Sequence, residues 1–209
     1  MANISINQYA QLSPAVMSLS IGGRYSILFD YDDYDKIRQY HWSISSNGYA
    51  CSGAGKGQIL FHRLVLNATP EENIDHINRN RLDNRKSNLR ICSASQNSYN
   101  KAHQSNCQSG YRGVALDQYG RWVANINQNG KSIFLGSYAT PEEAANAYDS
   151  AASIIAGDFA YRNLPHVPLR PNIFEELKGI RRKGRLTPEE YESILQLRRE
   201  GHTYDSIHL

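Results

Sequence analysis

Short apolar stretches separated by polar turns dominate the first part of the chain and predict a β-rich region at residues 21–57. The predicted elements are, in order, a strand at residues 24–29, a short acidic helix at residues 31–40, and a hairpin of residues 42–44 and 49–51 around Asn47-Gly48. An apolar run at residues 59–66 follows, interrupted only by His62 and Arg63. Aromatic residues are frequent in this region, and we expect most of them in its core.

The next stretch changes from strand to helix patterning. Residues 73–77 and 89–91 are β-prone, and the polar residues between them favour tight turns. Residues 93–96 match a helix-capping box, in which a serine oxygen accepts from orphan N–H groups and a glutamine reaches back. The predicted order is therefore strand, loop, strand, helix.

A second patterned region follows a polar, aperiodic segment at residues 101–109, which predicts a linker. Three short strands are predicted at residues 111–114, 121–127 and 131–136. Thr140 and Pro141 then mark the start of a helix that runs to about Ala156 and ends at Gly157.

Alternation sorts the two faces of this sheet. Trp122, Ala124 and Ile126 are predicted to face the alanine-rich helix. The opposite face has no predicted cover and carries Arg121, Asn125, Asn127 and Phe134. Arginine and asparagine pair with guanine and adenine edges in the major groove, although a polar sheet face is more often ordinary solvated surface.

Prolines at positions 165, 168 and 171 predict an extended linker after the second region. Helices are expected at residues 173–180 and 187–200. Residues 188–209 fit either a partial helix-turn-helix or a surface helical tail, and the pattern does not decide between them.

Composition bounds the class of protein. The 209 residues are 40% hydrophobic with a formal net charge of +3, which allows two or three small domains. Basic residues concentrate between residues 62 and 104 and at residues 181–185, where we expect phosphate contacts. No run approaches the ~18 apolar residues of a membrane span. Residues 1–20 do not resemble a signal peptide, so we expect a soluble protein that stays in the cytoplasm.

Cysteine usage suggests neither a disulfide framework nor a structural zinc site. Cys51, Cys92 and Cys107 are widely spaced and form no Cys-x-x-Cys pair. We expect buried or neutral thiols.

The candidate chemistry lies at Asp75, His76 and Asn97. A strand packed against the following helix could bring Asp75 and Asn97 together. Carboxylate and amide oxygens suit magnesium, which keeps several waters and takes phosphate oxygens as further ligands. Neutral His76 can accept a proton from an attacking water. These residues point to hydrolysis of a phosphodiester, although a lone Asp-His pair in a loop is usually just solvated.

Four short elements surround this site in the order DHI, LDNR, SNLR and QN-x-x-N, preceded by an HRL element. In type and spacing they resemble the HNH endonucleases, or ββα-metal nucleases, of phage and intron-encoded type. The resemblance implies that Asp75 and Asn97 bind one divalent metal, magnesium or another such as manganese. It also implies that His76 is the general base and that Asn88 orients its ring through a backbone or side-chain hydrogen bond. Position 97 is histidine in many relatives, and the asparagine here is similar to the homing-type, often nicking subset.

The same resemblance implies a DNA-contacting surface on the nuclease unit. Its members are His62, Arg63, Arg79, Arg81, Arg85, Lys86, Arg90 and Asn100. For His62 both a structural role and a phosphate contact are open, and for Arg63 an acidic neighbour is the alternative to DNA.

The second region contains YRGV, RWVA, FLG, TPEEAANAYDSAA and NLP in this order. The order is similar to the plant APETALA/ethylene-response-factor DNA-binding domain over residues 109–165. The resemblance implies a DNA-binding face made of Arg112, Arg121, Asn125, Asn127 and Phe134. Plant members carry further arginines where this chain has Ala115, Asp117 and Asn127, so the resemblance implies no base preference.

We therefore predict an α+β protein that cleaves double-stranded DNA with a divalent metal. It would combine a β-rich segment, a ββα-metal unit, a three-stranded antiparallel sheet packed on one helix, and a helical tail. The expected domains are an N-terminal extension at residues 1–20, a nuclease domain at residues 21–104 with a β-rich part (21–61) and a ββα core (62–104), an APETALA-like domain at residues 105–165, and the tail at residues 166–209.

The alternative is a DNA-binding regulator that keeps the HNH fold without cleavage. No membrane or small-molecule partner is expected. The target sequence, the number of strands cut and the oligomeric state are left open.

Overall fold

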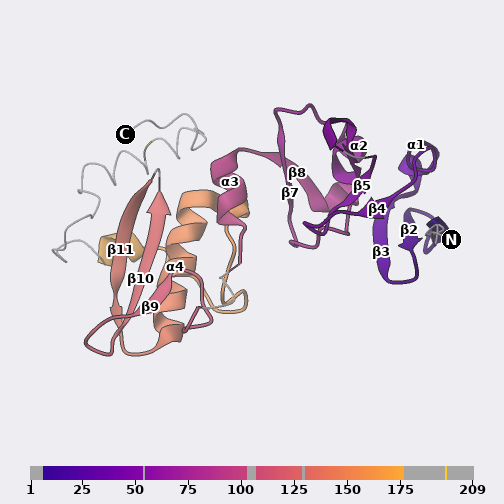
Figure 1. Ribbon diagram of the computed structural model, residues 1–209. Coiled ribbons are helices and arrows are strands. Elements are labelled where there is room, and N and C mark those ends of the chain that lie inside the picture. Colours follow the sequence, from indigo (N-terminus) through magenta and orange to yellow (C-terminus); the bar gives the residue numbers. More distant parts are fainter. Residues whose placement is uncertain (1–6, 54, 103–106, 129, 177–195, 197–209) are drawn as a thin grey trace. The chain divides into compact units, whose positions relative to one another are not determined.

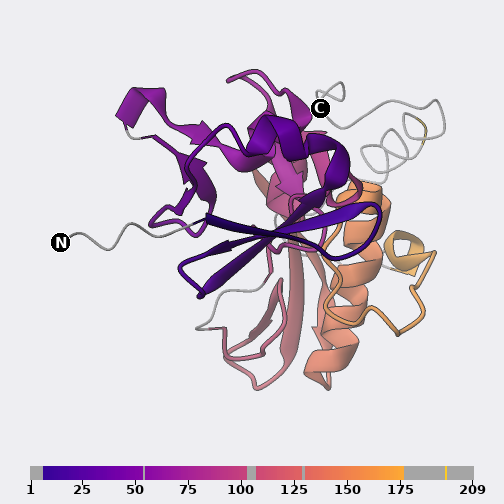
Figure 2. The same ribbon diagram turned by 90° about the vertical axis from the view of Figure 1, so that its right-hand side faces the viewer.

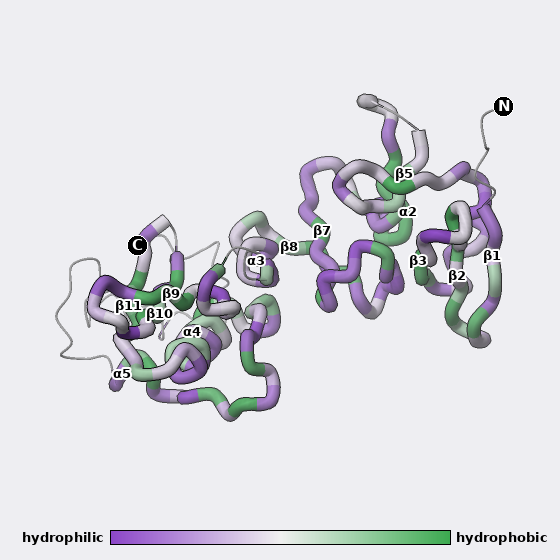
Figure 3. Tube along the Cα trace, turned by 60° about the horizontal axis from the view of Figure 1, so that its bottom comes forward, coloured by the Kyte–Doolittle hydropathy of each residue, from purple (hydrophilic) through white to green (hydrophobic). Residues whose placement is uncertain are grey.

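The computed structural model describes residues 7–53, 55–102, 107–128, 130–176 and 196 (Figure 1). The chain divides into two compact units, Met1–Ala94 and Ser95–Leu209, and each is described by itself. Figure 3 shows hydrophobic segments in both, for example at β5 of the first unit and β11 of the second.

The first unit opens with an antiparallel sheet of three strands, β1 (Asn7–Gln11), β2 (Val16–Ile21) and β3 (Tyr25–Asp30). Two of these strands lie in the segment that we expected to be an N-terminal extension. Met17, Leu19 and Ile21 are buried on one face of β2, while the serines between them are less buried. This two-residue period is the ordinary pattern of a half-buried strand.

The predicted hairpin around Asn47-Gly48 is confirmed. Strands β4 (Ser43–Ile44) and β5 (Ala50–Ser52) pair antiparallel, and Gly48 adopts a left-handed φ of 78° in the turn. The acidic segment forms η1 (Tyr31–Asp33) and α1 (Tyr34–Ile37). After η2 (Gly55–Gly57), the apolar run divides into β6 (Ile59–Leu60) and α2 (Phe61–Leu66).

Aromatic side chains form the centre of the first core. Phe29, Trp42 and Phe61 are fully buried. The Phe61 ring lies 4.5 Å from the Trp42 ring and 5.5 Å from the Phe29 ring between centroids. The Trp42 indole N–H donates to the carbonyl of Ile37 at 2.9 Å, so its one polar atom is satisfied. These contacts join β3, α1 and α2.

The predicted strand, loop, strand, helix unit is also confirmed. Strands β7 (Asn73–His76) and β8 (Leu89–Cys92) pair antiparallel, η3 (Lys86–Asn88) lies in the loop between them, and α3 (Ala94–Tyr99) follows. The loop is tied to β3, because Leu28 N–H donates to Leu82 O at 2.8 Å and Asn84 N–H donates to Leu28 O at 2.7 Å. Most of α3 belongs to the second unit.

The second unit contains a sheet in the order β11-β10-β9, all antiparallel, with α4 along one face (Figure 2). Its elements are β9 (Val114–Leu116), β10 (Trp122–Gln128), β11 (Lys131–Tyr138), α4 (Pro141–Ala156), η4 (Gly157–Phe159) and α5 (Ile173–Glu176). Ala124 and Ile126 are buried beneath the alanines of α4, which confirms the predicted core face.

The two ends of α4 follow local sequence signals, whereas the start of β9 follows a tertiary contact. Thr140 accepts from Glu143 N–H in a full capping box, and α4 ends before Gly157, as predicted. The first strand begins at Val114 rather than at Tyr111. Gly113 has a left-handed φ of 75° and packs against the Tyr148 ring, so the chain turns there before pairing begins.

The predicted helix at residues 173–180 is described only as α5. Apart from Gln196, the predicted helix at residues 187–200 and the possible helix-turn-helix lie outside the described residues. In the described part of the chain, no helix combines the length and the apolar character needed to cross a membrane.

Candidate active site

Asp75 and His76 are adjacent on β7, and each is only 5% exposed. Asp75 stands opposite Arg90 in the pairing of β7 with β8. Its Oδ2 accepts from Arg90 Nε at 2.9 Å and Nη2 at 2.6 Å. A buried carboxylate needs a compensating charge, and Arg90 supplies it. Arg90, expected to contact DNA, thus has its guanidinium on Asp75.

His76 is buried next to the side chains of Asn84, His62 and Tyr49. Its Nε2 lies 3.2 Å from Asn84 Oδ1, and its ring lies 5.3 Å from the His62 ring and 6.0 Å from the Tyr49 ring between centroids. Burial lowers the pKa of His76 below its usual 6.5, although the hydrogen bond with Asn84 and the nearby Asp75 act in the opposite direction. His76 is therefore neutral at neutral pH, the form in which an imidazole can accept a proton.

His62, on α2, is the second buried imidazole. It is 7% exposed, and its Nδ1 has no hydrogen-bond partner among the described residues. Burial first, then His76 and Arg63, lowers the pKa of His62 to about 3. Two neutral rings can pack together without charge repulsion, so His62 and Tyr49 form a low-polarity wall beside His76.

Asn88 closes the loop between β7 and β8. Its Oδ1 accepts from Asn78 N–H at 2.9 Å, and its Nδ2 donates to Asn78 Oδ1 at 3.0 Å and to Asp83 O at 2.7 Å. The side-chain oxygen at His76 Nε2 belongs instead to Asn84, which is fully buried. Our sequence analysis did not single out Asn84. Its only sequence signal is membership of the LDNR element, which does not show that the side chain turns inward.

Several basic side chains of the expected DNA surface contact protein atoms. Arg85 forms two 2.7 Å hydrogen bonds with Asp83, and Lys86 forms a 2.8 Å ion pair with Asp33. Arg81 lies over the Tyr49 ring, 4.8 Å from its centroid. Arg63 donates to the carbonyls of Thr69 and Glu72. Arg79 is exposed, with a left-handed φ of 63°, and Asn100 is buried.

The proposed metal ligands belong to different units. Asp75 is in the first unit, whereas Asn97 lies half-buried in the part of α3 that belongs to the second. The described residues contain no group of three or more His, Cys, Asp or Glu side chains that could hold a metal ion. One carboxylate and one amide oxygen still fit a hard divalent cation, because such a cation can take its remaining oxygens from water and phosphate.

In the expected DNA face of the second unit, Asn125 and Asn127 alternate with the β10 residues buried against α4, whereas Arg121 borders a cavity beside that helix. Arg121 and Asn127 are exposed, and Asn125 and Phe134 are half-buried. Arg121 Nη2 donates to Ser137 O at 3.0 Å. Arg112 is placed differently, because its guanidinium donates to backbone carbonyls at the end of α3.

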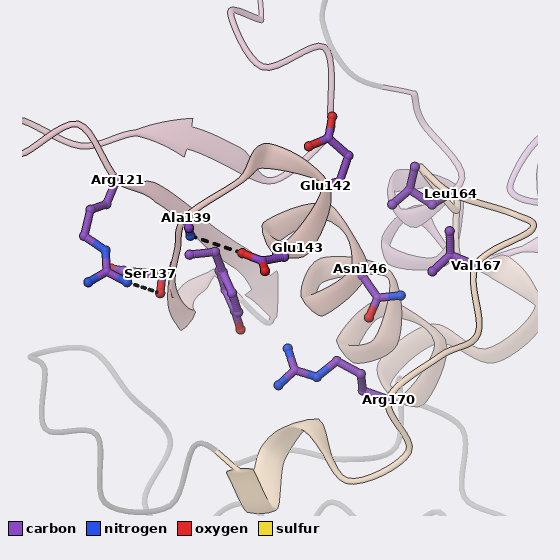
Figure 4. A pocket seen from close by; sticks show the side chains of 10 residues that line it. Arg121, Ser137, Ala139, Glu142, Glu143, Asn146, Leu164, Val167 and Arg170 are labelled. Carbon is purple, nitrogen blue, oxygen red and sulfur yellow. Dashed lines mark hydrogen bonds between the residues drawn. The ribbon is translucent and has the colours of Figure 1, made fainter.

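A cavity of about 730 Å³ opens beside α4 in the second unit (Figure 4). Its walls include Arg121, Tyr138, Glu143 and Arg170. Glu143 completes the cap of α4, and Arg170 lies 5.8 Å from the centroid of the Tyr138 ring. The cavity contains neither Asp75 nor His76, so it is separate from the candidate chemistry.

The described geometry thus comprises a buried histidine beside a carboxylate on a β-hairpin and a small three-stranded sheet backed by one helix. Residues 60–99 match a family model described as HNH endonuclease, and residues 109–157 match one described as AP2 domain. The chain is 31% identical over 158 residues to an uncharacterized HNH endonuclease of Acanthamoeba polyphaga mimivirus, covering 71% of this chain and 82% of that protein. The chain therefore belongs to the HNH endonuclease family.

Plant proteins match the second unit. Identity is 46% over 69 residues with a dehydration-responsive element-binding protein of Oryza sativa subsp. japonica, and 42% over 59 residues with an ethylene-responsive transcription factor of Arabidopsis thaliana. These matches cover 32% and 27% of this chain but only 22% and 32% of the plant proteins. No solved structure matches. The fusion of an HNH unit with an AP2-like unit is confirmed, and DNA is its partner.

Proposed function

We propose that this chain is a homing-type endonuclease in which His76 is the general base for phosphodiester hydrolysis and the AP2-like unit selects the site on double-stranded DNA. The observation that supports this most directly is the buried, neutral His76 next to a carboxylate held by Arg90. Asn97 favours the homing-type subset, whose members often cut one strand.

Asn84 determines which nitrogen of His76 accepts the proton. Asn84 Nδ2 donates to Arg81 O at 3.4 Å, which leaves Oδ1 as the atom that faces the imidazole. His76 Nε2 then carries a hydrogen and donates it to Asn84. In that tautomer Nδ1 carries the lone pair and is the nitrogen that would take the proton from the attacking water.

Asp75 and Asn97 would hold the divalent cation, magnesium or manganese. When bound, the cation supplies positive charge that stabilises the phosphate in the transition state. The role of Arg90 is to hold Asp75 in place, because its guanidinium donates twice to Asp75 Oδ2 in a buried environment.

Contact with DNA would come mainly from the sheet face with Arg121, Asn125, Asn127 and Phe134. Arginine and asparagine there can pair with base edges. On the nuclease unit, Arg79, Arg81 and Lys86 are the exposed members of the expected contact set.

Plasmid cleavage tests the general base. We expect the purified chain to cut or nick plasmid DNA when magnesium or manganese is added. His76→Ala should lose cleavage while its gel-shift affinity for DNA survives, because the removed group acts on the water and not on DNA binding. His41→Ala, which removes an exposed histidine, is the matched control and should cut normally. Equal cleavage by His76→Ala would show that the assignment of the base is wrong.

The alternative function is a DNA-binding regulator without cleavage. The wild-type chain would then bind DNA in a gel shift but leave plasmid intact with either metal. The retention of Asp75, His76, Asn88 and Asn97 favours the nuclease, since binding alone requires none of these side chains.

A further inference from the structure

The end of helix α3 is built into the core of the AP2-like unit. Tyr99, its last residue, is 7% exposed and packs in the same hydrophobic cluster as Ala124 and Ile126 of β10. Its hydroxyl donates to Asn127 O, also on β10, at 2.7 Å. The helix end just before the expected linker at residues 101–109 is therefore fixed to the AP2-like unit.

Arg112 holds the same helix end from a second side. Its Nη2 donates to Ser98 O at 2.9 Å, and its Nη1 donates to Tyr99 O at 2.8 Å and to Lys101 O. The last carbonyls of a helix have no partner within the helix, and a cation at this end is electrostatically favourable. Tyr161 N–H adds a 3.0 Å hydrogen bond to Tyr99 O.

Arg112 is itself fixed to α4. Its guanidinium lies over the Tyr148 ring, 5.8 Å from the centroid, and its backbone N–H donates to Asn163 Oδ1 at 2.7 Å. Asn163 in turn donates to the buried carboxylate of Asp149, on α4. A continuous set of hydrogen bonds thus joins the end of α3 to the helix that backs the DNA-binding sheet.

We propose that Arg112 and Tyr99 are positioning residues that make the AP2-like unit carry Asn97. This inference rests on the proposed function, in which Asn97 is a metal ligand. Asn97 directly precedes the carbonyls that Arg112 binds, so the body that reads the DNA site also sets where this ligand lies. An arginine expected on the DNA face serves here to join DNA recognition to metal binding.

The first experiment measures the anchor without metal or DNA. Hydrogen exchange of amides in residues 94–101 is compared in the wild-type chain, Arg112→Gln, Tyr99→Phe and the control Arg170→Gln, which removes an arginine of the same unit that pairs with Glu176. We expect exchange in this segment to become about tenfold faster in the first two variants only, with protection of β10 retained. Unchanged exchange in both variants would show that Arg112 and Tyr99 do not anchor the end of α3.

The second experiment measures the consequence for the metal. Arg112→Gln and Tyr99→Phe should need about tenfold more Mg²⁺ for half-maximal cleavage while gel-shift affinity changes less than about threefold, because misplacing one ligand weakens the metal site. A normal Mg²⁺ requirement with a loosened α3 would overturn the positioning role. Loss of DNA affinity in Arg112→Gln with unchanged exchange would place Arg112 on DNA instead. No cleavage by the wild-type chain would overturn the proposed function, and the positioning role with it, while the exchange result would still decide whether the anchor exists.

Discussion

Much of the positive charge near His76 is bound to protein atoms. Arg85, Lys86 and Arg90 each pair with a carboxylate, at distances of 2.6–2.8 Å. The sequence shows a cluster of cations and supports a phosphate-binding surface, but it does not show which cations meet a carboxylate in the fold. The adjacency of Asp75 and His76 was predictable because it is local. The neighbour of His76 was not, because Asn84 reaches it only through the fold of the loop.

Two substitutions of Asn84 should shift the pH dependence of cleavage in opposite directions. Asn84→Leu removes the hydrogen bond that raises the pKa of His76, so the acid limb of the cleavage rate should move to lower pH. Asn84→Asp places a carboxylate beside the imidazole and favours its charged form, so the same limb should move to higher pH. The pH dependence of the single-turnover cleavage rate measures both shifts.

Cleavage by Asn84→Leu should also be slower, because the ring is no longer held by its side-chain partner. Circular dichroism would verify that both variants remain folded. Acid limbs that coincide with that of the wild-type chain would show that Asn84 does not act on the base.

Elements with local signals were predictable, and those set by tertiary contacts were not. Helix α4 begins and ends where Thr140, Pro141 and Gly157 indicate, because capping acts within a few residues. Strand β9 starts later than its apolar pattern suggests, because Gly113 packs against Tyr148, far away in the sequence. The apolar run at residues 59–66 received neither a helix nor a strand prediction, and it divides into β6 and α2.

Gly113 and Gly120 have the same φ but different surroundings, so alanine substitutions at the two positions distinguish the cost of backbone strain from the cost of close packing. A Cβ at Gly113 would lie 2.0 Å from Tyr148 Cδ2 and 2.7 Å from Asn125 O, whereas a Cβ at Gly120 would meet nothing within 4 Å; both residues have φ of 75°. Gly120→Ala should reduce the free energy of unfolding by about 1 kcal/mol through strain alone. Gly113→Ala should reduce it by about 3 kcal/mol or more.

Urea unfolding followed by circular dichroism measures both glycine variants. Similar losses in the two would mean that the Tyr148 contact yields easily and does not determine where β9 begins.

The two units divide the proposed work between chemistry and site selection. The whole-chain organisation, an HNH unit followed by an AP2-like unit, was predictable from the order of short elements in each. The division of the chain inside α3 was not, because it depends on where Tyr99 packs. Sequence patterns identify the parts of each unit, whereas packing decides to which unit a helix belongs.

Arg121→Ala tests this division of work. If Arg121 reads a base, the variant should lose ~1–3 kcal/mol of binding free energy on the preferred site and little on random DNA. At saturating DNA its cleavage rate should stay close to that of the wild-type chain, the opposite of the result expected for His76→Ala. Arg24→Ala removes an equal charge from an exposed turn of the first unit and is the control. An unchanged site preference in Arg121→Ala would mean that this arginine does not read the sequence.

The backbone hydrogen bond from Asn84 N–H to Leu28 O affects which part of the chain must be moved together if this nuclease unit is fused to another protein. The stretch that matches the HNH family, residues 60–99, includes Asn84 but not the strand that grips its backbone. A gene fragment restricted to that stretch would encode Asp75, His76 and Asn84 but not Leu28, the residue that accepts from Asn84 N–H. A recombinant protein that is to keep the backbone hydrogen bonds of Leu28 with Leu82 and Asn84 therefore has to include β3 as well, whether it arises in nature or in the laboratory.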